Sequence, residues 1–284
     1  MERASPPLNP APDVTPIVLI PARMASSRLP GKPLAPIAGV PMVVHVLRRA
    51  EAAGVGPVAV ACAEPEIAAA VRAAGGTAVL TDPDLPSGSD RCFAALAALD
   101  PDGRHDVVVN LQGDLPTLEP AAIRTVLGPL AEPSCDIATL VTPIRDAGEA
   151  TAPNFVKAAV QFAEGQAYAL APYFSRLPVP SGQGPLWHHI GIYAWRRDVL
   201  ARFVALPPSP LERREKLEQL RAIEAGMRIF CARIDTAPFG VDTPEDLARA
   251  RAILEQIGHS WDQPCAWRCS QGTPGAVSTM WKPL

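Results

Sequence analysis

The chain lacks an apolar run long enough to cross a bilayer: runs such as Ile17–Ile20 are short, whereas a transmembrane helix needs about 20 apolar residues. It also lacks an excess of charge of one sign, because 26 lysines and arginines stand against 29 aspartates and glutamates. A dedicated nucleic-acid binder usually carries a strong basic excess. The start, Met1–Asn9, lacks the apolar core of a signal peptide. We therefore expect no membrane insertion, no nucleic-acid partner and a cytoplasmic location.

Cysteine is sparse and proline is abundant. Six cysteines over 284 residues do not form a disulfide scaffold, and Cys62 and Cys231, which lie in apolar runs, are expected to be buried thiols. Proline reaches 33 residues, and five of these in the first sixteen positions predict a start without helix or strand. The hydrophobic share of 48% is enough for a sizeable core and too high for general disorder.

Strand-like and helix-like segments alternate through the first half of the chain. The pattern predicts strands at 17–20, 57–62, 77–80, 106–110 and 136–142 and helices at 42–53, 64–74, 90–98 and 119–130. Near-continuous apolar strands between helices favour an α/β fold whose mostly parallel sheet is covered on both faces. From about residue 151 the pattern becomes a smaller mixed sheet, with strands at 155–162, 167–170, 190–195 and 227–234 and helices at 211–225 and 243–257.

A basic loop, Pro21–Pro33, follows the first strand. It holds Arg23, Arg28 and Lys32 and no acid, and small residues and proline dominate the rest. Ligands of α/β proteins bind at the carboxyl ends of the strands, where backbone N–H groups and cations can hold phosphates. It is not a Walker loop, because proline follows the lysine. The loop therefore indicates a triphosphate site, with a solvated basic loop as the alternative.

Two aspartates, far apart in the sequence, could share a metal ion. Asp114 follows the apolar strand that begins at Val107, and Asp242 directly precedes the last helix, for which Thr243 is the expected N-cap. A partly hydrated Mg²⁺ usually takes one or two carboxylates from the protein. The alternatives are an Asx-type turn for Asp114 and helix capping for Asp242.

A turn of small residues, Pro86–Arg91, enters the helix expected at 90–98. Its Ser-Gly-Ser sequence suits contact with a base or a ribose. Ser87 or Ser89 could equally serve only as the N-cap of that helix.

Taken together, these segments resemble the 3-deoxy-manno-octulosonate (Kdo) cytidylyltransferases, or CMP-Kdo synthetases. The motifs that carry the resemblance are Pro-Ala-Arg-x-Ala-Ser-x-Arg-Leu-Pro-Gly-Lys-Pro, Ser-Gly-Ser-Asp-Arg, Asn-x-Gln-Gly-Asp-x-Pro and Val-Asp-Thr-Pro-Glu-Asp-Leu. Later segments, Tyr173–Arg176, His189–Tyr193 and Ser209–Arg221, are also similar, so the resemblance covers about residues 16–257. It implies a Rossmann-like nucleotidyltransferase, a Mg²⁺-dependent homodimer that converts CTP and Kdo into CMP-Kdo and pyrophosphate for lipopolysaccharide biosynthesis.

The resemblance also implies roles for individual residues. The expected catalytic residues are Arg23, Lys32, Asp114 and Asp242, the two aspartates being the metal ligands. The expected nucleotide-binding residues are Ala22, Arg23, Ser26, Arg28, Lys32, Ser87, Gly88 and Arg91. The expected sugar-binding residues are Gln112, Arg176, His189, Tyr193, Glu218 and Gln219. Alternatives are open for four of these: a hydrogen-bonded strand histidine at 189, a packing tyrosine at 193 and solvated helix surface at 218 and 219.

The same resemblance suggests a division of the chain. We expect a proline-rich start (1–15), a nucleotide-binding part (16–150), a sugar-binding and dimerisation part (151–235), a return to the main sheet with a final helix (236–257) and an irregular tail (258–284). A metal site in the tail, from His259, Cys265 and Cys269, has only weak spacing support.

Three positions depart from the family's usual pattern. Leu115 stands where a glutamate is common, and His188 stands where an arginine is usual. Cys62 and Ala63 stand where the family often has the pair Thr-Asp. Three other functions stay open: a cytidylyltransferase for another acidic sugar, such as 8-amino-Kdo or a nonulosonic acid, a transferase for another nucleotide, or a non-catalytic nucleotide-binding relative.

Overall fold

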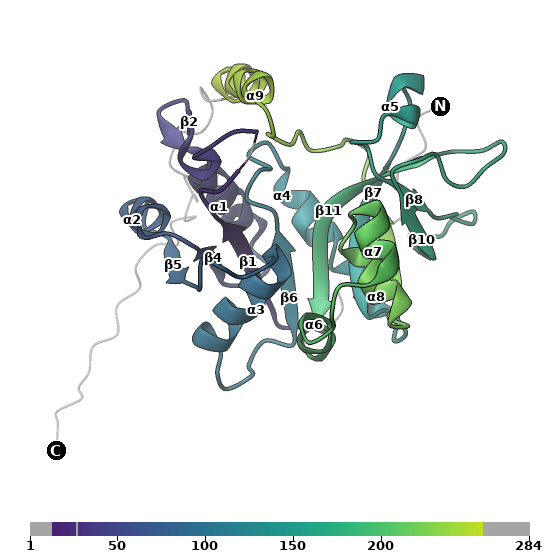
Figure 1. The fold of residues 1–284 in the computed structure, drawn as a ribbon, viewed down its shortest axis with the longest axis horizontal. Helices are drawn as coiled ribbons and strands as arrows, with labels where there is room; N and C mark the ends of the chain where they lie inside the picture. Colours follow the sequence, from purple (N-terminus) through teal and green to yellow (C-terminus); the bar gives the residue numbers. More distant parts are fainter. Residues whose placement is uncertain (1–12, 27, 258–284) are drawn as a thin grey trace, which may run out of the picture.

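A computed structural model describes residues 13–26 and 28–257 (Figure 1). Most of the predicted proline-rich start and all of the predicted tail, with His259, Cys265 and Cys269, lie outside the described residues. Among the residues described, no helix is both long and apolar enough to cross a membrane.

One large sheet forms the centre of the molecule, with strand order β5-β4-β1-β6-β11-β7-β12-β9. Its strands are β1 (Pro16–Ala22), β4 (Val58–Cys62), β5 (Thr77–Leu80), β6 (Val107–Leu111), β7 (Ile137–Pro143), β9 (Tyr168–Leu170), β11 (Trp187–Arg196) and β12 (Ile229–Arg233). Pairing is parallel from β5 to β6, whereas β11 runs antiparallel between β6 and β7. The predicted α/β class with a mostly parallel sheet is confirmed.

Shorter strands extend one edge of this sheet and form a separate hairpin. β8 (Lys157–Ala159) pairs with β11 and with β10 (Tyr173–Ser175). β2 (Pro36–Ile37) and β3 (Val40–Pro41) form the two-stranded hairpin. The second half of the chain therefore contributes strands to the main sheet as well as a small antiparallel extension.

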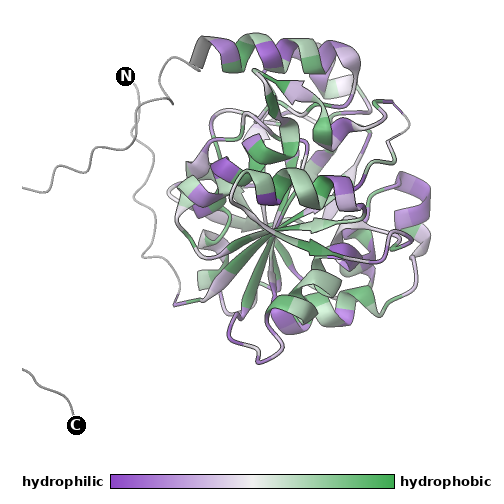
Figure 2. Ribbon diagram, turned by 90° about the vertical axis from the view of Figure 1, so that its left-hand side faces the viewer, coloured by the Kyte–Doolittle hydropathy of each residue, from purple (hydrophilic) through white to green (hydrophobic). Residues whose placement is uncertain are grey.

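Helices cover both faces of the sheet. The helices are α1 (Met42–Ala53), α2 (Pro65–Ala73), α3 (Gly88–Leu99), α4 (Pro120–Thr125), α5 (Ala147–Thr151), α6 (Arg197–Val204), α7 (Pro210–Glu215), α8 (Gln219–Glu224) and α9 (Pro244–Ile257). Alternation along β1 feeds two cores: Val18 and Ile20 pack with α1, α2 and α4, and Leu19 packs with α3, α6 and α8. Figure 2 shows the apolar strands in the middle and polar helix surfaces outside.

The predicted elements agree with the structure where apolar periodicity is strong. Helix 42–53 and strand 77–80 have the predicted bounds, and Cys62 and Cys231 are buried. The helix predicted at 119–130 ends at Thr125 and is followed by a short 3₁₀ turn, and the strand predicted at 155–162 shortens to β8. Helices α5 and α6, strand β10 and the β2–β3 hairpin were not predicted.

The single helix predicted at 211–225 is wrong, because the chain breaks between α7 and α8. Lys216 adopts a left-handed φ of +54° at this break. Arg176 donates from Nε to the carbonyl oxygen of Glu215 at 2.8 Å and from Nη2 to that of Lys216 at 3.2 Å. In a continuous helix these carbonyl oxygens would accept hydrogen bonds from later backbone N–H groups. Here Arg176 donates to them instead, so a tertiary contact replaces the hydrogen bonds of the helix.

Candidate active site

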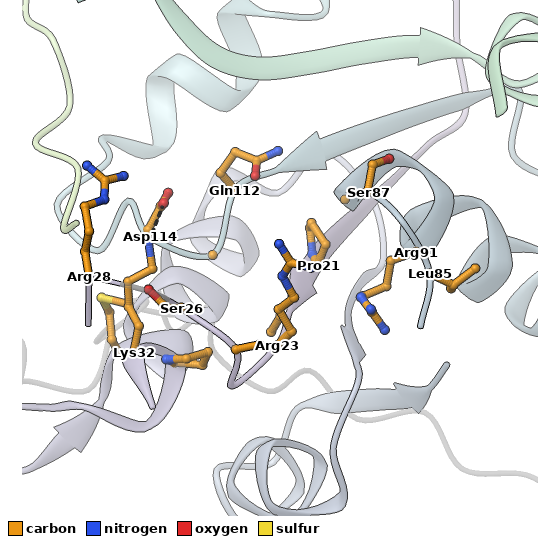
Figure 3. A pocket seen from close by; sticks show the side chains of 16 residues that line it. Pro21, Arg23, Ser26, Arg28, Lys32, Leu85, Ser87, Arg91, Gln112 and Asp114 are labelled. Carbon is orange, nitrogen blue, oxygen red and sulfur yellow. Dashed lines mark hydrogen bonds and ion pairs between the residues drawn. The ribbon is translucent and has the colours of Figure 1, made fainter. Parts of the chain in front are cut away.

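A cavity of about 340 Å³ opens at the carboxyl ends of β1 and β6, next to the start of α3 (Figure 3). The loop after β1, the turn before α3 and the loop after β6 form its walls. Its lining includes Ala22, Arg23, Ser26, Arg28, Lys32, Ser87, Gly88, Arg91, Gln112 and Asp114. All the residues predicted to contact the nucleotide are therefore brought to one cavity.

The basic loop is held in a compact turn by its own backbone. Gly31 has a φ of +72°, which favours glycine, and its N–H donates to the carbonyl oxygen of Met24 at 3.2 Å. The N–H of Lys32 donates to the carbonyl oxygen of Leu29 at 3.1 Å, and the N–H of Leu29 donates to the Ser26 hydroxyl at 3.3 Å. This turn directs the Lys32 side chain toward Asp114 (Figure 3).

The ammonium group of Lys32 lies between the two predicted metal-binding aspartates. Its Nζ is 2.9 Å from Oδ2 of Asp114 and 3.1 Å from Oδ1 of Asp242. Arg28 lies 2.9 Å from the other oxygen of Asp242. Burial alone would lower the pKa of Lys32, but the two carboxylates outweigh it and raise that pKa, so the ammonium group stays charged.

Backbone contacts explain how aspartates so far apart in sequence meet. The N–H of Val241 donates to the carbonyl oxygen of Asp114 at 2.9 Å. Thr243 caps α9 as predicted, because its hydroxyl accepts from the N–H of Asp246 at 3.2 Å. The cap therefore belongs to Thr243, and the carboxylate of Asp242 turns to Lys32 instead.

The aspartate pair fits a divalent cation that completes its ligands from elsewhere. In the described part of the chain, no group of three or more His, Cys, Asp or Glu residues converges as a metal site by itself. Asp114 and Asp242 nevertheless both reach one cationic nitrogen. Mg²⁺ is commonly bound by one or two carboxylates together with substrate phosphates and water, and the pair offers such a carboxylate set.

The turn before α3 forms the wall opposite the basic loop. The Ser87 hydroxyl is the N-cap of α3 and accepts from the N–H of Asp90 at 3.2 Å. Arg91 lines the cavity, but its guanidinium donates to the hydroxyl and carbonyl oxygens of segment 81–83 at distances from 2.6 to 3.2 Å. Arg91 thus also holds the segment that leads into α3.

Gln112 is the one predicted sugar-binding residue that lines the cavity. Its Nε2 donates to Oδ1 of Asn110 at 3.2 Å, and Nδ2 of Asn110 donates to the Ser89 hydroxyl at 3.4 Å. Asn110 is only 1% exposed. It was not predicted as a site residue, although a polar residue in an otherwise apolar strand signals a buried hydrogen-bonding role.

Arg176 lies outside the cavity lining, and backbone carbonyls occupy its guanidinium. It donates to the carbonyl oxygens of Pro153, Glu215 and Lys216. The Glu215 carboxylate in turn accepts from the N–H of Arg176 and from the Ser175 hydroxyl, each at 3.1 Å. Glu215 thus holds this segment in place, and nothing in a charged helical stretch of sequence signals such a role.

His189 and Tyr193 lie together on β11, also outside the cavity lining. Nε2 of His189 lies 2.9 Å from the Thr139 hydroxyl, and its ring packs against Phe174 and Tyr193. Burial lowers the pKa of His189 to about 3, so its imidazole is neutral, and burial raises the pKa of Tyr193. These contacts agree with the alternatives of a hydrogen-bonded strand histidine at position 189 and a packing tyrosine at position 193.

Glu218 is the N-cap of α8, and Gln219 is the first residue of that helix. Oε1 of Glu218 lies 2.7 Å from the Ser87 hydroxyl, so Glu218 touches the cavity wall from behind. Gln219 is 4% exposed, and its Nε2 finds no hydrogen-bond partner among the described residues. The solvated-surface alternative is therefore wrong for Gln219.

The three departures from the family pattern lie in packed surroundings. Leu115 and Ala63 are buried, and Leu115 joins the core that α1, α2 and α4 cover. The ring of His188 packs against Phe155 with centroids 4.9 Å apart. None of the three takes a place among the side chains that contact Lys32.

Comparison with known proteins gives relatives along most of the chain. A family model described as cytidylyltransferase matches residues 17–229. A 3-deoxy-manno-octulosonate cytidylyltransferase of Paramagnetospirillum magneticum is 62% identical over 243 residues, which are 86% of this chain and 99% of that protein. A protein of the same description from Rhodospirillum rubrum is 65% identical over 240 residues, which are 84% of this chain and 95% of the relative.

Solved structures give the same picture. A CMP:2-keto-3-deoxy-manno-octonic acid synthetase complexed with CTP aligns with a TM-score of 0.78 and 41% identity, covering 86% of this chain and 99% of that chain. A nucleotidyl transferase from Methanothermobacter aligns with a TM-score of 0.53 at 15% identity, covering 86% of this chain and 99% of its own, a likeness of fold alone.

Proposed function

This chain belongs to the cytidylyltransferase family and, within it, to the 3-deoxy-manno-octulosonate cytidylyltransferases, and we propose that the cavity beneath its basic loop is where it transfers CMP from CTP to Kdo. The products are CMP-Kdo and pyrophosphate. The observation that carries this placement is the meeting of Lys32, Asp114 and Asp242 at the mouth of the loop.

The basic loop binds the triphosphate of CTP. Arg23, Arg28 and Lys32 supply the positive charge, and the Ser26 hydroxyl and nearby backbone N–H groups are within the same cavity wall. Charge-assisted hydrogen bonds of this kind are about twice as strong as neutral ones. Ser87 and Gly88, on the opposite wall, contact the nucleoside.

A divalent metal ion is typical of this kind of nucleotidyl transfer, and Asp114 and Asp242 would hold Mg²⁺ here. When bound, the ion would polarise phosphate oxygens and make the attacking hydroxyl group more acidic. Lys32 keeps the two carboxylates together and stays charged beside them. Its charge also stabilises the negative charge that builds up on departing pyrophosphate.

The reaction is a direct displacement. The anomeric hydroxyl oxygen of Kdo forms a bond to the α-phosphorus of CTP, loses its proton, and the bond from that phosphorus to the bridging oxygen of pyrophosphate breaks. No covalent bond to the protein forms, so positioning and charge stabilisation supply most of the rate.

The sugar lies between the cavity and the second half of the chain. Gln112 faces it from the cavity wall, and Glu218 and Gln219 approach from α8. Arg176, which directly follows β10, shapes the far side together with His189 and Tyr193 of β11. A homodimer formed through the second half of the chain, around residues 151–235, completes the proposal for the cytoplasmic enzyme.

Pyrophosphate release with CTP and Mg²⁺ across a panel of acidic sugars tests this proposal. Turnover with Kdo is expected, and well-folded protein that turns over neither Kdo nor a close analogue would contradict it. Asp114→Asn is expected to raise the Mg²⁺ concentration for half-maximal rate by at least about tenfold. A full Mg²⁺-dependent rate in this variant, with the exposed Asp235→Asn as control, would remove Asp114 from the metal site.

A further inference from the structure

One hydroxyl group lies between two carboxylates where α8 meets the start of α3. The Oγ of Ser87 is 2.6 Å from Oδ2 of Asp90 and 2.7 Å from Oε1 of Glu218. The same Oγ accepts a hydrogen bond from the N–H of Asp90 at 3.2 Å. Ser87 also lines the nucleotide cavity, so these contacts join α8 to the cavity wall.

The contacts require more protons than the serine has. A serine hydroxyl carries one hydrogen, and both short distances are those of O–H···O hydrogen bonds. Ser87 can therefore donate to only one carboxylate. The second contact needs a proton on the other carboxyl group, since two lone pairs at that distance would repel each other.

In the part of the chain that the structure describes, no arginine near this cluster donates a hydrogen bond to Glu218. Arg221, on the same helix, forms a two-bond ion pair with Glu212 at 2.6 and 2.8 Å. Arg91, on α3, gives its guanidinium to segment 81–83. Neither arginine therefore neutralises Glu218 through a direct hydrogen bond, so the missing proton is not replaced by a cation in contact with it.

Three uncharged groups of the described chain also lie around Glu218. The Ser89 hydroxyl and the Cys92 thiol face it from α3, and the Tyr193 phenol faces it from β11. Burial raises the pKa of both Cys92 and Tyr193. An ionised Glu218 would face the carboxylate of Asp90 across the Ser87 hydroxyl, so two like charges would share one hydroxyl group.

We propose that Glu218 is a protonated carboxylic acid that donates its hydrogen to Ser87, while Ser87 donates to the ionised Asp90. Glu218 is then a positioning residue. From the start of α8, it holds Ser87 in place in the wall of the nucleotide cavity. All three oxygen atoms obtain a partner in this arrangement, and no carboxylate pair is left in repulsion.

The proton is assigned to Glu218 and not to Asp90. Burial raises the pKa of Glu218, and although hydrogen bonds from Ser87 and Ser89 and the charge of Arg221 oppose this, the pKa stays above its usual value. Asp90 lies in the first turn of α3, and both its N–H and its Oδ2 contact the Ser87 hydroxyl, at 3.2 and 2.6 Å.

The arrangement predicts a pH-dependent nucleotide affinity. Because folding keeps the proton on Glu218, the contact is intact at low pH and is lost as the pH rises through the raised pKa. Asp90 and Glu218 then repel each other and Ser87 loses a donor. The KM for CTP is expected to rise about threefold to tenfold over that range, the size expected from one hydrogen bond.

Infrared difference spectroscopy on the full chain locates the proton directly and does not depend on the proposed function. A carbonyl stretching band of a protonated carboxyl group is expected at neutral pH in the wild type, absent in Glu218→Gln, and retained in the control Glu224→Gln, an exposed position on the same helix. A wild type without the band, or a band that persists in Glu218→Gln, would overturn the proposal.

The kinetic test rests on the proposed function and is read separately. In Glu218→Gln the amide always donates, so the alkaline rise in KM for CTP should disappear, whereas Glu218→Ala should show a raised KM at every pH. An unchanged pH-dependent rise in Glu218→Gln would contradict the positioning role. Should either variant fail to fold, ¹³C NMR of wild-type glutamate carboxyls answers the question: one must titrate above the usual range, and none doing so overturns the proposal.

Discussion

Lys32 is the residue on which the site depends most at the scale of single side chains. Its side chain is 16% exposed, and its ammonium group contacts carboxylates from two loops that are far apart in sequence. Removing it leaves two acidic groups facing each other and, under the proposed function, takes one cation from the triphosphate. The proposal thus gives this residue a structural role and a catalytic one.

We expect Lys32→Met to lower kcat/KM for CTP by about a hundredfold to a thousandfold, the usual loss for one electrostatic stabiliser of a transition state. Steady-state pyrophosphate release measures this, with Lys32→Arg as the charge-conserving variant and the exposed Arg48→Met, on α1, as control. A Lys32→Met enzyme within about threefold of the wild type would exclude Lys32 from the chemistry.

We expect His189 to cause part of the loss of folding stability at low pH. Its pKa of about 3 lies below the ordinary 6.5, so the folded state binds fewer protons than the unfolded state. The stability from this group is complete above pH 6.5 and is lost as the pH falls toward 3. His189→Gln should therefore lose less in melting temperature between pH 6.5 and 4 than the wild type does. The half-buried His105→Gln is the control, and equal losses in all three proteins would exclude His189 as the cause.

At the scale of elements, sequence predicts best where one local signal decides the outcome. The apolar periodicity of 42–53 and the short β-branched run at 77–80 gave the bounds found in the structure, because both elements bury a continuous apolar face. The Thr243 cap was predicted for the same reason: the partner N–H lies three residues away in sequence. The residues predicted to bind the nucleotide line one cavity because parallel strands end at one edge of the sheet.

The surroundings of the residues predicted to bind the sugar could not be predicted equally well, because their contacts join segments that are far apart in sequence. Arg176 matches a sugar-binding motif, yet its guanidinium goes to carbonyl groups of two other segments. The Glu218 contact with Ser87 spans the two halves of the chain. No local pattern encodes such pairings, and the break between α7 and α8 has the same origin.

The break at Lys216 gives a prediction about stability. A left-handed φ of +54° costs an L-residue about 1–2 kcal/mol, while glycine pays about 0.5–1 kcal/mol in chain entropy. Lys216 is exposed, and its carbonyl bond to Arg176 needs no side chain. Lys216→Gly should therefore raise the free energy of unfolding by about 0.5–1 kcal/mol in urea titrations. Lys216→Ala should give no gain, and equal effects of both substitutions would contradict the strain argument.

For the molecule as a whole, the last described helix, α9, packs against the segment that follows Lys32 near the start of the described chain. Leu247, Ala250 and Leu254 of α9 form a third core with Ile37 and Met42, and Nε of Arg251 donates to the carbonyl oxygen of Pro36 at 2.9 Å. Figure 1 shows α9 beside β2. The helix that follows Asp242 is thus packed on the hairpin that follows Lys32.

Two truncated chains distinguish the role of α9 in packing from any role of residues 258–284. Deleting 258–284 should leave kcat and the KM for CTP within about twofold of the full chain, since the matched relative from Paramagnetospirillum is covered over 99% of its length by 86% of this chain. Deleting 244–284 also removes α9, and with it the apolar contacts that seat Asp242 next to Lys32. Its Mg²⁺-dependent pyrophosphate release should fall by at least about a hundredfold, the loss expected when catalytic groups are misplaced by about an ångström. Equal activity of the two truncated chains would show that α9 does not place the aspartate, whereas an inactive first truncation would give the tail a role in the reaction.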